Sequence, residues 1–126
     1  MKMNAGISNK RDRLYQDLIK FCPDFAQVWD DPDSLYSLFR YENGSFSVCG
    51  LFMDFGRYVY DHLDRLSEQT TQSLFSYIEE CMNSSDPEIN NEVGAGFLEH
   101  FDRQSVEKIE PYLGSKTKAF LSAWCG

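Results

Sequence analysis

A regular apolar spacing in the middle of the chain constrains the fold more than any other sequence feature. From residue 46 to residue 67 no proline interrupts the sequence, and apolar residues recur every three or four positions. Phe52, Phe55 and Val59 show this spacing, which is the period of one face of an α-helix. The segment is also longer than an ordinary strand. We therefore predict a helix over 46–67 that buries this face.

Shorter helical segments lie on either side of this helix. Their predicted ranges are 8–21, 23–30, 35–42, 69–83, 87–101 and 105–110, with a last helix from Ser115. Ser8 and Ser115 are residue types that cap helix N-termini well. Asp86 followed by Pro87 is a typical helix start, and Pro23 ends the first helix because proline lacks the backbone donor. Gly94 and Gly96 cost about 1 kcal/mol each inside a helix, so we expect a neighbouring helix to approach them closely.

The Asn43-Gly44 pair leaves a second interpretation open near residues 36–50. An Asn-Gly pair between apolar segments is the usual sign of a β-hairpin. The flanking apolar residues do not alternate cleanly with polar ones, which favours helices instead. We predict an all-α fold, an irregular or HEAT-like bundle of six to eight helices in a single domain over residues 1–126, with a possible short β-hairpin near 36–50.

The acidic residues concentrate in the middle of the sequence. The net charge of the chain is −8, but residues 21–102 hold sixteen acids against three arginines, a net charge of −13. Residues 1–20 carry +3 and residues 103–126 carry +2. Such a surface repels nucleic-acid phosphates and favours encounter with a basic protein. The same charge would also keep a helical protein soluble.

No constellation of residues for catalysis or cofactor binding is recognisable. The sequence has no glycine-rich phosphate loop, no EF-hand spacing and no Cys-x-x-Cys pair. His62 and His100 have acids beside them in sequence, but neighbours one or two apart on a helix point in different directions. We predict a protein that is not an enzyme and that needs no cofactor or metal. A hydrolase or metal-dependent enzyme that uses His62 or His100 is an alternative.

The chain contains no apolar segment long enough to cross a membrane. Its first residues hold Lys2 but no apolar stretch behind it, so they do not read as a signal peptide. These observations predict a cytoplasmic protein without membrane contact. They do not indicate an oligomeric state.

Several motifs over about residues 45–125 resemble a group of small bacterial proteins. They are Gly96-Phe97-Leu98-Glu99, Tyr112-Leu113-Gly114 and the terminal Trp124. In these motifs the chain resembles immunity proteins of contact-dependent growth inhibition and related polymorphic toxin systems. The resemblance implies tight binding to a cognate toxin domain, often over its active site. Many such toxins are nucleases with cationic clefts, which an acidic surface would suit. The resemblance carries over no catalytic residues.

The charge pattern and the resemblance together predict an immunity protein that neutralises a toxin, of the nuclease type, by covering its basic active-site cleft. The residues expected to bind the toxin are acids in loops and at helix ends: Asp30, Asp31, Asp33, Glu79, Glu80, Asp86, Glu88 and Glu92. The alternative is a helical adaptor or regulator that binds another protein through exposed aromatic side chains. Its candidates are Tyr36, Tyr41, Tyr58, Tyr60 and Tyr77.

Overall fold

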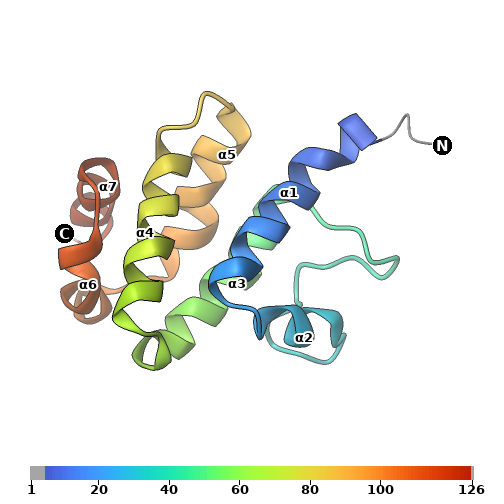
Figure 1. The fold of residues 1–126 in the computed structure, drawn as a ribbon, viewed down its shortest axis with the longest axis horizontal. Coiled ribbons are helices and arrows are strands. Elements are labelled where there is room, and N and C mark those ends of the chain that lie inside the picture. Colours follow the sequence, from blue (N-terminus) through green and yellow to red (C-terminus); the bar gives the residue numbers. More distant parts are fainter. Residues whose placement is uncertain (1–4, 126) are drawn as a thin grey trace.

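A computed structural model describes the backbone of residues 5–125 and the side chains of residues 10–125. Within this range the fold is all-α, as predicted, and contains no strand, so the β-hairpin alternative near 36–50 is wrong (Figure 1). The α-helices of the described range are α1 (Ala5–Phe21), α2 (Phe25–Asp30), α3 (Val48–His62), α4 (Glu68–Met82), α5 (Pro87–Glu92), α6 (Arg103–Ile109) and α7 (Ser115–Cys125).

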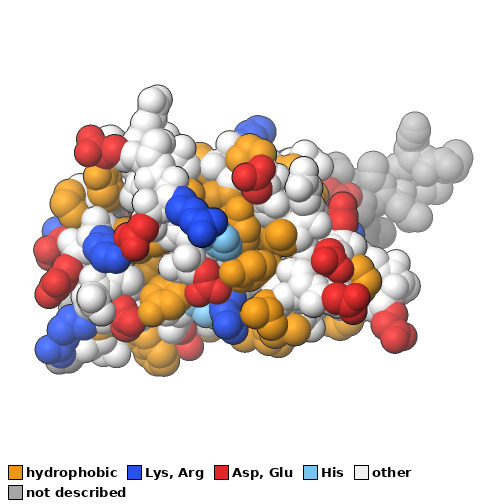
Figure 2. Space-filling model, turned by 90° about the horizontal axis from the view of Figure 1, so that it is seen from below, with side chains coloured by type: hydrophobic (Ala, Val, Ile, Leu, Met, Phe, Trp, Pro, Cys, Tyr) orange, Lys and Arg blue, Asp and Glu red, His pale blue; other side chains and the backbone are white. Residues whose placement is uncertain are grey.

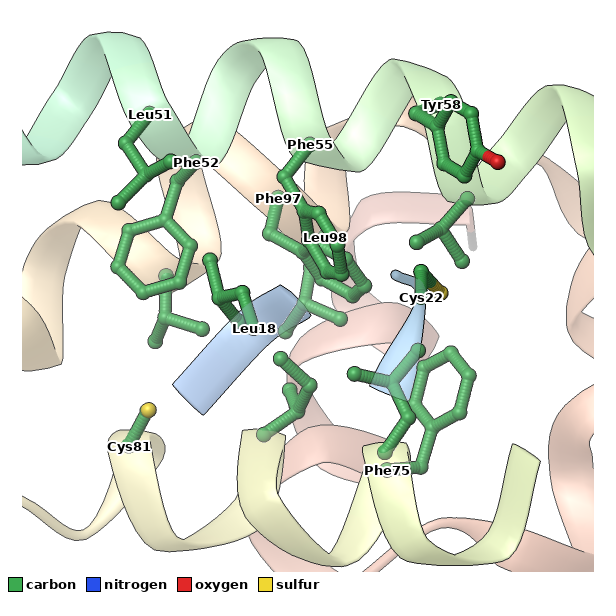
Figure 3. Close-up of a cluster of buried hydrophobic side chains, with 14 of the residues drawn as sticks. Leu18, Cys22, Leu51, Phe52, Phe55, Tyr58, Phe75, Cys81, Phe97 and Leu98 are labelled. Atoms are coloured by element: carbon green, nitrogen blue, oxygen red, sulfur yellow. The ribbon is translucent and has the colours of Figure 1, made fainter. Parts of the chain in front are cut away.

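Helix α3 corresponds to the predicted central helix and lies in the hydrophobic core. It begins where the Ser47 hydroxyl accepts a hydrogen bond of 2.9 Å from the backbone N–H of Gly50. It ends at His62, before the predicted end at residue 67, because the next turn (Leu63–Arg65) is a 3₁₀-helix. Figure 3 shows side chains of α3 directed towards those of α1 and α4; among them Phe52 and Phe55 have no exposed surface. The other elements are therefore arranged around this helix.

The predicted helix 87–101 is confirmed at its start but is not regular throughout. The Asp86 carboxylate caps α5 by accepting a bond of 2.9 Å from the N–H of Glu88, and Pro87 is the first helical residue. A π-helical turn (Val93–Phe97) and a 3₁₀ turn (Leu98–His100) follow α5. The predicted close approach at the glycines is confirmed, since a Cβ on Gly96 would lie 2.8 Å from the Cβ of Phe52. The glycine thus lets this segment pack directly on α3.

Two predicted helix starts are wrong. Ser8 lies inside α1 and not at its start, because the helix already includes Ala5. The predicted helix 105–110 begins earlier, at Arg103, because Asp102 accepts a bond of 2.8 Å from the N–H of Ser105 and forms a capping box. The last helix, α7, lies where it was predicted, but Ser115 is its first helical residue and not its cap, because the Gly114 carbonyl accepts the first helical bond, at 2.9 Å from the N–H of Lys118.

The largest difference from prediction is that residues 31–47 form no helix. They make a series of turns between α2 and α3, so the predicted helix 35–42 is wrong. The apolar side chains that gave it helical spacing are directed to solvent rather than to the core: Leu35 is 59% exposed and Leu38 is 62% exposed. The backbone N–H groups of this loop bond partly to carbonyls within its turns and partly to side chains, as Phe39 does to Asp54, and they form no helical ladder. We call residues 31–47 the α2–α3 loop.

None of the helices that the structure describes is both long and apolar enough to span a membrane.

Candidate partner-binding surface

The eight acids predicted to bind a partner lie in two separate regions of the molecule. Three of them, Asp30, Asp31 and Asp33, lie at the C-terminal end of α2 and the start of the α2–α3 loop. The others lie near the C-terminal end of α4 or on α5. Figure 1 places α2 at the lower right and the connection between α4 and α5 at the top. The acids therefore do not form a single continuous patch.

The acids at the end of α2 are exposed and differ in how they are bonded. The Asp30 carboxylate lies 2.6 Å from the Arg40 guanidinium and is thus neutralised by it. Asp31 accepts a hydrogen bond of 3.0 Å from the backbone N–H of Asp33, which fixes the turn at the start of the loop. Asp31 and Asp33 are exposed at the surface.

Glu79 has a structural role that the sequence did not predict. Its carboxylate accepts bonds from the backbone N–H groups of Lys116, at 3.0 Å, and Thr117, at 2.9 Å. Partial burial acts to raise the pKa of Glu79, but the bonds from Thr117 and Lys116 outweigh it and hold the pKa below its usual value. Glu79 is thus a cap that α4 supplies to the N-terminus of α7. The neighbouring Glu80 is exposed.

The acids on α5 are partly compensated by α1. The Lys10 ammonium lies 3.1 Å from the Asp86 carboxylate and 2.6 Å from that of Glu88. The hydrogen bond from Lys10 is the main cause that lowers the pKa of Asp86. Glu92 is half-buried beside Cys49, whose thiol pKa is raised by burial and then by this carboxylate. The α5 region is therefore less available to a cationic partner than the end of α2.

The α2–α3 loop exposes a cluster of large apolar side chains. Leu35, Leu38, Phe39 and Tyr41 are 59%, 62%, 43% and 58% exposed, all within seven consecutive residues. Leu38 and Tyr41 border an open hollow of about 620 Å³. Figure 2 shows hydrophobic side chains beside acidic ones towards the right, on the face where α2 lies. We call these four residues the apolar cluster.

A buried carboxylate holds the loop in place beneath this cluster. Asp54 on α3 is 2% exposed, and its Oδ2 accepts hydrogen bonds from the Trp29 indole N–H, at 3.1 Å, and from the backbone N–H of Phe39, at 3.0 Å. Burial raises the pKa of Asp54, and the bonds from Phe39 and Trp29 lower it by less. One side chain of α3 thus joins α2 to the middle of the loop.

Arg40 provides the second attachment of the loop. Its guanidinium carbon lies 4.4 Å from the centre of the Trp29 ring, a cation–π geometry. The same group donates hydrogen bonds to the backbone carbonyls of Trp29, at 3.1 Å, and Gly44, at 3.2 Å. Because its donors are used in these bonds, Arg40 holds the loop against Trp29 and is not a free cation at the surface.

Of the tyrosines proposed as anchors, Tyr41 is the one that is mainly exposed. Tyr36 donates a hydrogen bond to Asp61 and packs edge-on against Tyr58, which is 8% exposed. The hydroxyls of the other two are bonded to carboxylates that lie far away in sequence: Tyr60 to Asp102 and Tyr77 to Asp17. Sequence reasoning missed the leucines and Phe39, because their helical spacing indicated a buried face.

The histidines and cysteines are held in structural contacts. His62 Nδ1 lies 2.8 Å from the Tyr58 carbonyl, and His100 Nε2 lies 2.9 Å from the Met53 carbonyl. Burial lowers the pKa of His100. Burial also raises the pKa of the cysteine thiols in the core, to about 11 at Cys22 and about 12 at Cys81, which keeps them protonated at neutral pH. Across the described part of the chain no three His, Cys, Asp or Glu side chains are grouped to hold a metal ion.

The described residues therefore define an all-helical domain with exposed acids and a hydrogen-bonded loop that presents apolar side chains. The chain belongs to the family of the domain of unknown function DUF7674, whose model matches residues 15–125. This range includes the C-terminal part of α1, from Tyr15 onwards, and everything from α2 to α7. No curated protein and no solved structure matches the chain.

Proposed function

We propose that this chain is an immunity protein that binds a cognate toxin domain, of the nuclease type, and covers its basic active-site cleft. The observation that carries the proposal is the net charge of −13 over residues 21–102. The acids of this segment that lie at the surface steer a cationic partner into encounter and raise the association rate. The resemblance of residues 45–125 to immunity proteins supports the same function. Such a protein acts in the cytoplasm, without a catalytic step or cofactor of its own.

The acids best placed for this role lie at the end of α2. Asp31 and Asp33 are exposed, and Glu42 in the same loop is exposed as well. By contrast, the carboxylates of Glu79 and Asp86 are already used as helix caps. We therefore assign the main electrostatic contact to the start of the α2–α3 loop, with Glu80, Glu88 and Glu92 as a secondary region.

The exposed apolar cluster also favours a second candidate, a helical adaptor that binds a different protein. The two functions differ in how binding depends on salt. Binding to a basic cleft weakens strongly as ions screen the charges, because the Debye length falls from about 10 Å at 0.1 M to about 3 Å at 1 M. An adaptor that binds through apolar side chains keeps most of its affinity over the same range.

The test uses the toxin domain encoded beside the gene for this chain, co-expressed with the chain and also purified for binding. We expect the chain to protect cells from the toxin, to inhibit nuclease activity in vitro and to bind more weakly at high salt. No binding at low salt, or the absence of a neighbouring toxin gene, would remove the proposal. Affinity that does not change with salt would favour the adaptor.

A matched pair of variants locates the electrostatic contact. Asp31→Asn/Asp33→Asn/Glu42→Gln removes three charges from the loop, and we expect about three- to tenfold slower association, since exposed charges act mainly on the on-rate. The control Asp12→Asn/Glu107→Gln/Glu110→Gln removes three charges elsewhere and changes the net charge equally. Equal effects of the two variants would show that total charge, rather than the loop, controls binding.

A further inference from the structure

We infer that the apolar cluster of the α2–α3 loop is the anchor of this interface and inserts into an apolar depression within a cationic protein surface. The inference rests on the proposed function and adds to it the residues that hold the complex together. Charges at the end of α2 would set the rate of encounter, and the apolar cluster would set the lifetime of the complex.

The exposure of these side chains is the first observation. Five large hydrophobic side chains of the described residues are exposed, and four of them belong to the apolar cluster. The fifth, Trp124, is 51% exposed on α7, at the other end of the molecule in Figure 1. Isolated apolar residues on a surface are ordinary, but a concentration in seven residues is typical of an interaction site.

The bonds that hold the loop against α3 are the second observation. The backbone N–H of Phe39 is bonded to the buried Asp54, and the turn at residues 41–45 is closed by backbone bonds of 2.9 and 3.0 Å. Gly50 on α3 lets the loop approach closely, since a Cβ there would lie 2.9 Å from the Phe39 carbonyl oxygen. A loop held in this way loses little conformational freedom on binding, which favours tight association.

The charges around the cluster identify the kind of occupant. Asp31, Asp33 and Glu42 flank the apolar residues, and Arg40 is already paired with Asp30. A second copy of this chain would bring the same acids face to face across a two-fold axis, where like charges repel. A partner with Lys and Arg side chains around an apolar depression complements both parts of the surface. We therefore assign the site to a basic protein and not to self-association.

The experiment compares Leu38→Ser/Tyr41→Ser with Trp124→Ser, which removes an exposed apolar side chain far from the loop. Binding of each variant to the neighbouring toxin domain is measured by surface plasmon resonance at low and high salt. We expect the loop variant to bind at least about tenfold more weakly, through faster dissociation and at both salt concentrations. We expect the Trp124→Ser control to bind like the wild type. Circular dichroism checks that both variants fold.

The possible results separate this inference from the proposed function. If the wild type binds and the loop variant dissociates as slowly as the wild type, the anchor is refuted while the proposed function stands. If the wild type does not bind the toxin domain, both are refuted. Light scattering addresses self-association, and a dimer that Leu38→Ser/Tyr41→Ser converts to a monomer would overturn the choice of a basic partner.

Discussion

Asp54 offers the most direct test of how the α2–α3 loop is held. Replacing it with alanine leaves two hydrogen-bond donors without their acceptor. The indole N–H of Trp29 is buried, so it bears the full penalty of about 1–3 kcal/mol for an unsatisfied group. The N–H of Phe39 belongs to a half-exposed residue and can be hydrated, so its cost is smaller. Relief of the buried carboxylate offsets part of the loss.

We expect Asp54→Ala to lower the free energy of unfolding by about 2–3 kcal/mol, which corresponds to a fall in Tm of roughly 10 °C for a domain of this size. Asp54→Asn keeps one acceptor oxygen and removes the buried charge, so its loss should be about 1 kcal/mol or less. Urea unfolding followed by circular dichroism measures both. The control is Asp64→Ala, whose side chain is 78% exposed and should change stability by less than about 0.5 kcal/mol.

If Asp54→Ala were as stable as the wild type, the hydrogen bonds of Asp54 would not be what stabilises the loop. Equal losses in the alanine and asparagine variants would show instead that the charge, and not the acceptor geometry, matters. The first of these results would also show that Asp54 does not hold the loop in place. A loss in Asp54→Ala with little loss in Asp54→Asn would support the role of the hydrogen bonds.

The pH dependence of stability, compared between the wild type and Asp54→Asn, tests the burial of this carboxylate independently. Burial raises the pKa of Asp54 above its ordinary value of 3.8. The Asp54 carboxyl group therefore binds its proton more tightly in the folded state than in the unfolded state. Its contribution to stability is complete below pH 3.8 and is lost as the pH rises through the folded-state pKa. The stability of the wild type relative to Asp54→Asn should fall as the pH rises across this window, and a rise would contradict it.

Two further predictions concern helix capping and helix packing. Glu79→Gln should lower stability by about 1 kcal/mol, as loss of an N-cap does, whereas Glu80→Gln on the exposed side should have little effect. Because the pKa of Glu79 lies below its ordinary value of 4.5, the loss should be present above pH 4.5 and should disappear as the pH falls through the folded-state pKa. Gly96→Ala should lower the free energy of unfolding by about 1–3 kcal/mol, because its Cβ would lie 2.8 Å from the Cβ of Phe52 on α3. Gly94→Ala should lower stability by less, since its Cβ would meet only the outer edge of the half-buried Phe120 ring, which can move aside. Thermal denaturation measures both variants, and equal losses of stability would contradict this explanation.

The helices that the sequence predicted correctly are those whose apolar side chains enter the core. In α3 and α4 the spacing of residues such as Phe55 and Leu74 reflects burial, and both side chains have no exposed surface. The signals at Asp86 and Pro87 are local, so the start of α5 was also predictable. The exact end of α3 was harder to predict, because the 3₁₀ turn that follows it continues the same apolar spacing.

The α2–α3 loop could not be predicted because distant residues determine it. Leu35, Leu38 and Phe39 have the spacing of a helix, yet Asp54, fifteen residues beyond Phe39, takes up the backbone donor. Nothing in the local sequence indicates that bond. The role of Glu79 was missed for the same reason, since its partners lie thirty-seven and thirty-eight residues away on α7. Acidic residue type alone does not distinguish a cap from a free surface charge.

The attachment of the α2–α3 loop has a consequence for how such a protein can change over time. Asp54, Trp29 and Arg40 fix the backbone through bonds that do not involve the exposed side chains of Leu38 and Tyr41. Substitutions at these two positions therefore alter what the loop presents without disturbing the contacts that shape it. In the proposed interface, recognition and folding are therefore encoded by different residues, and a mutation that changes partner specificity would leave the stability of the scaffold unchanged.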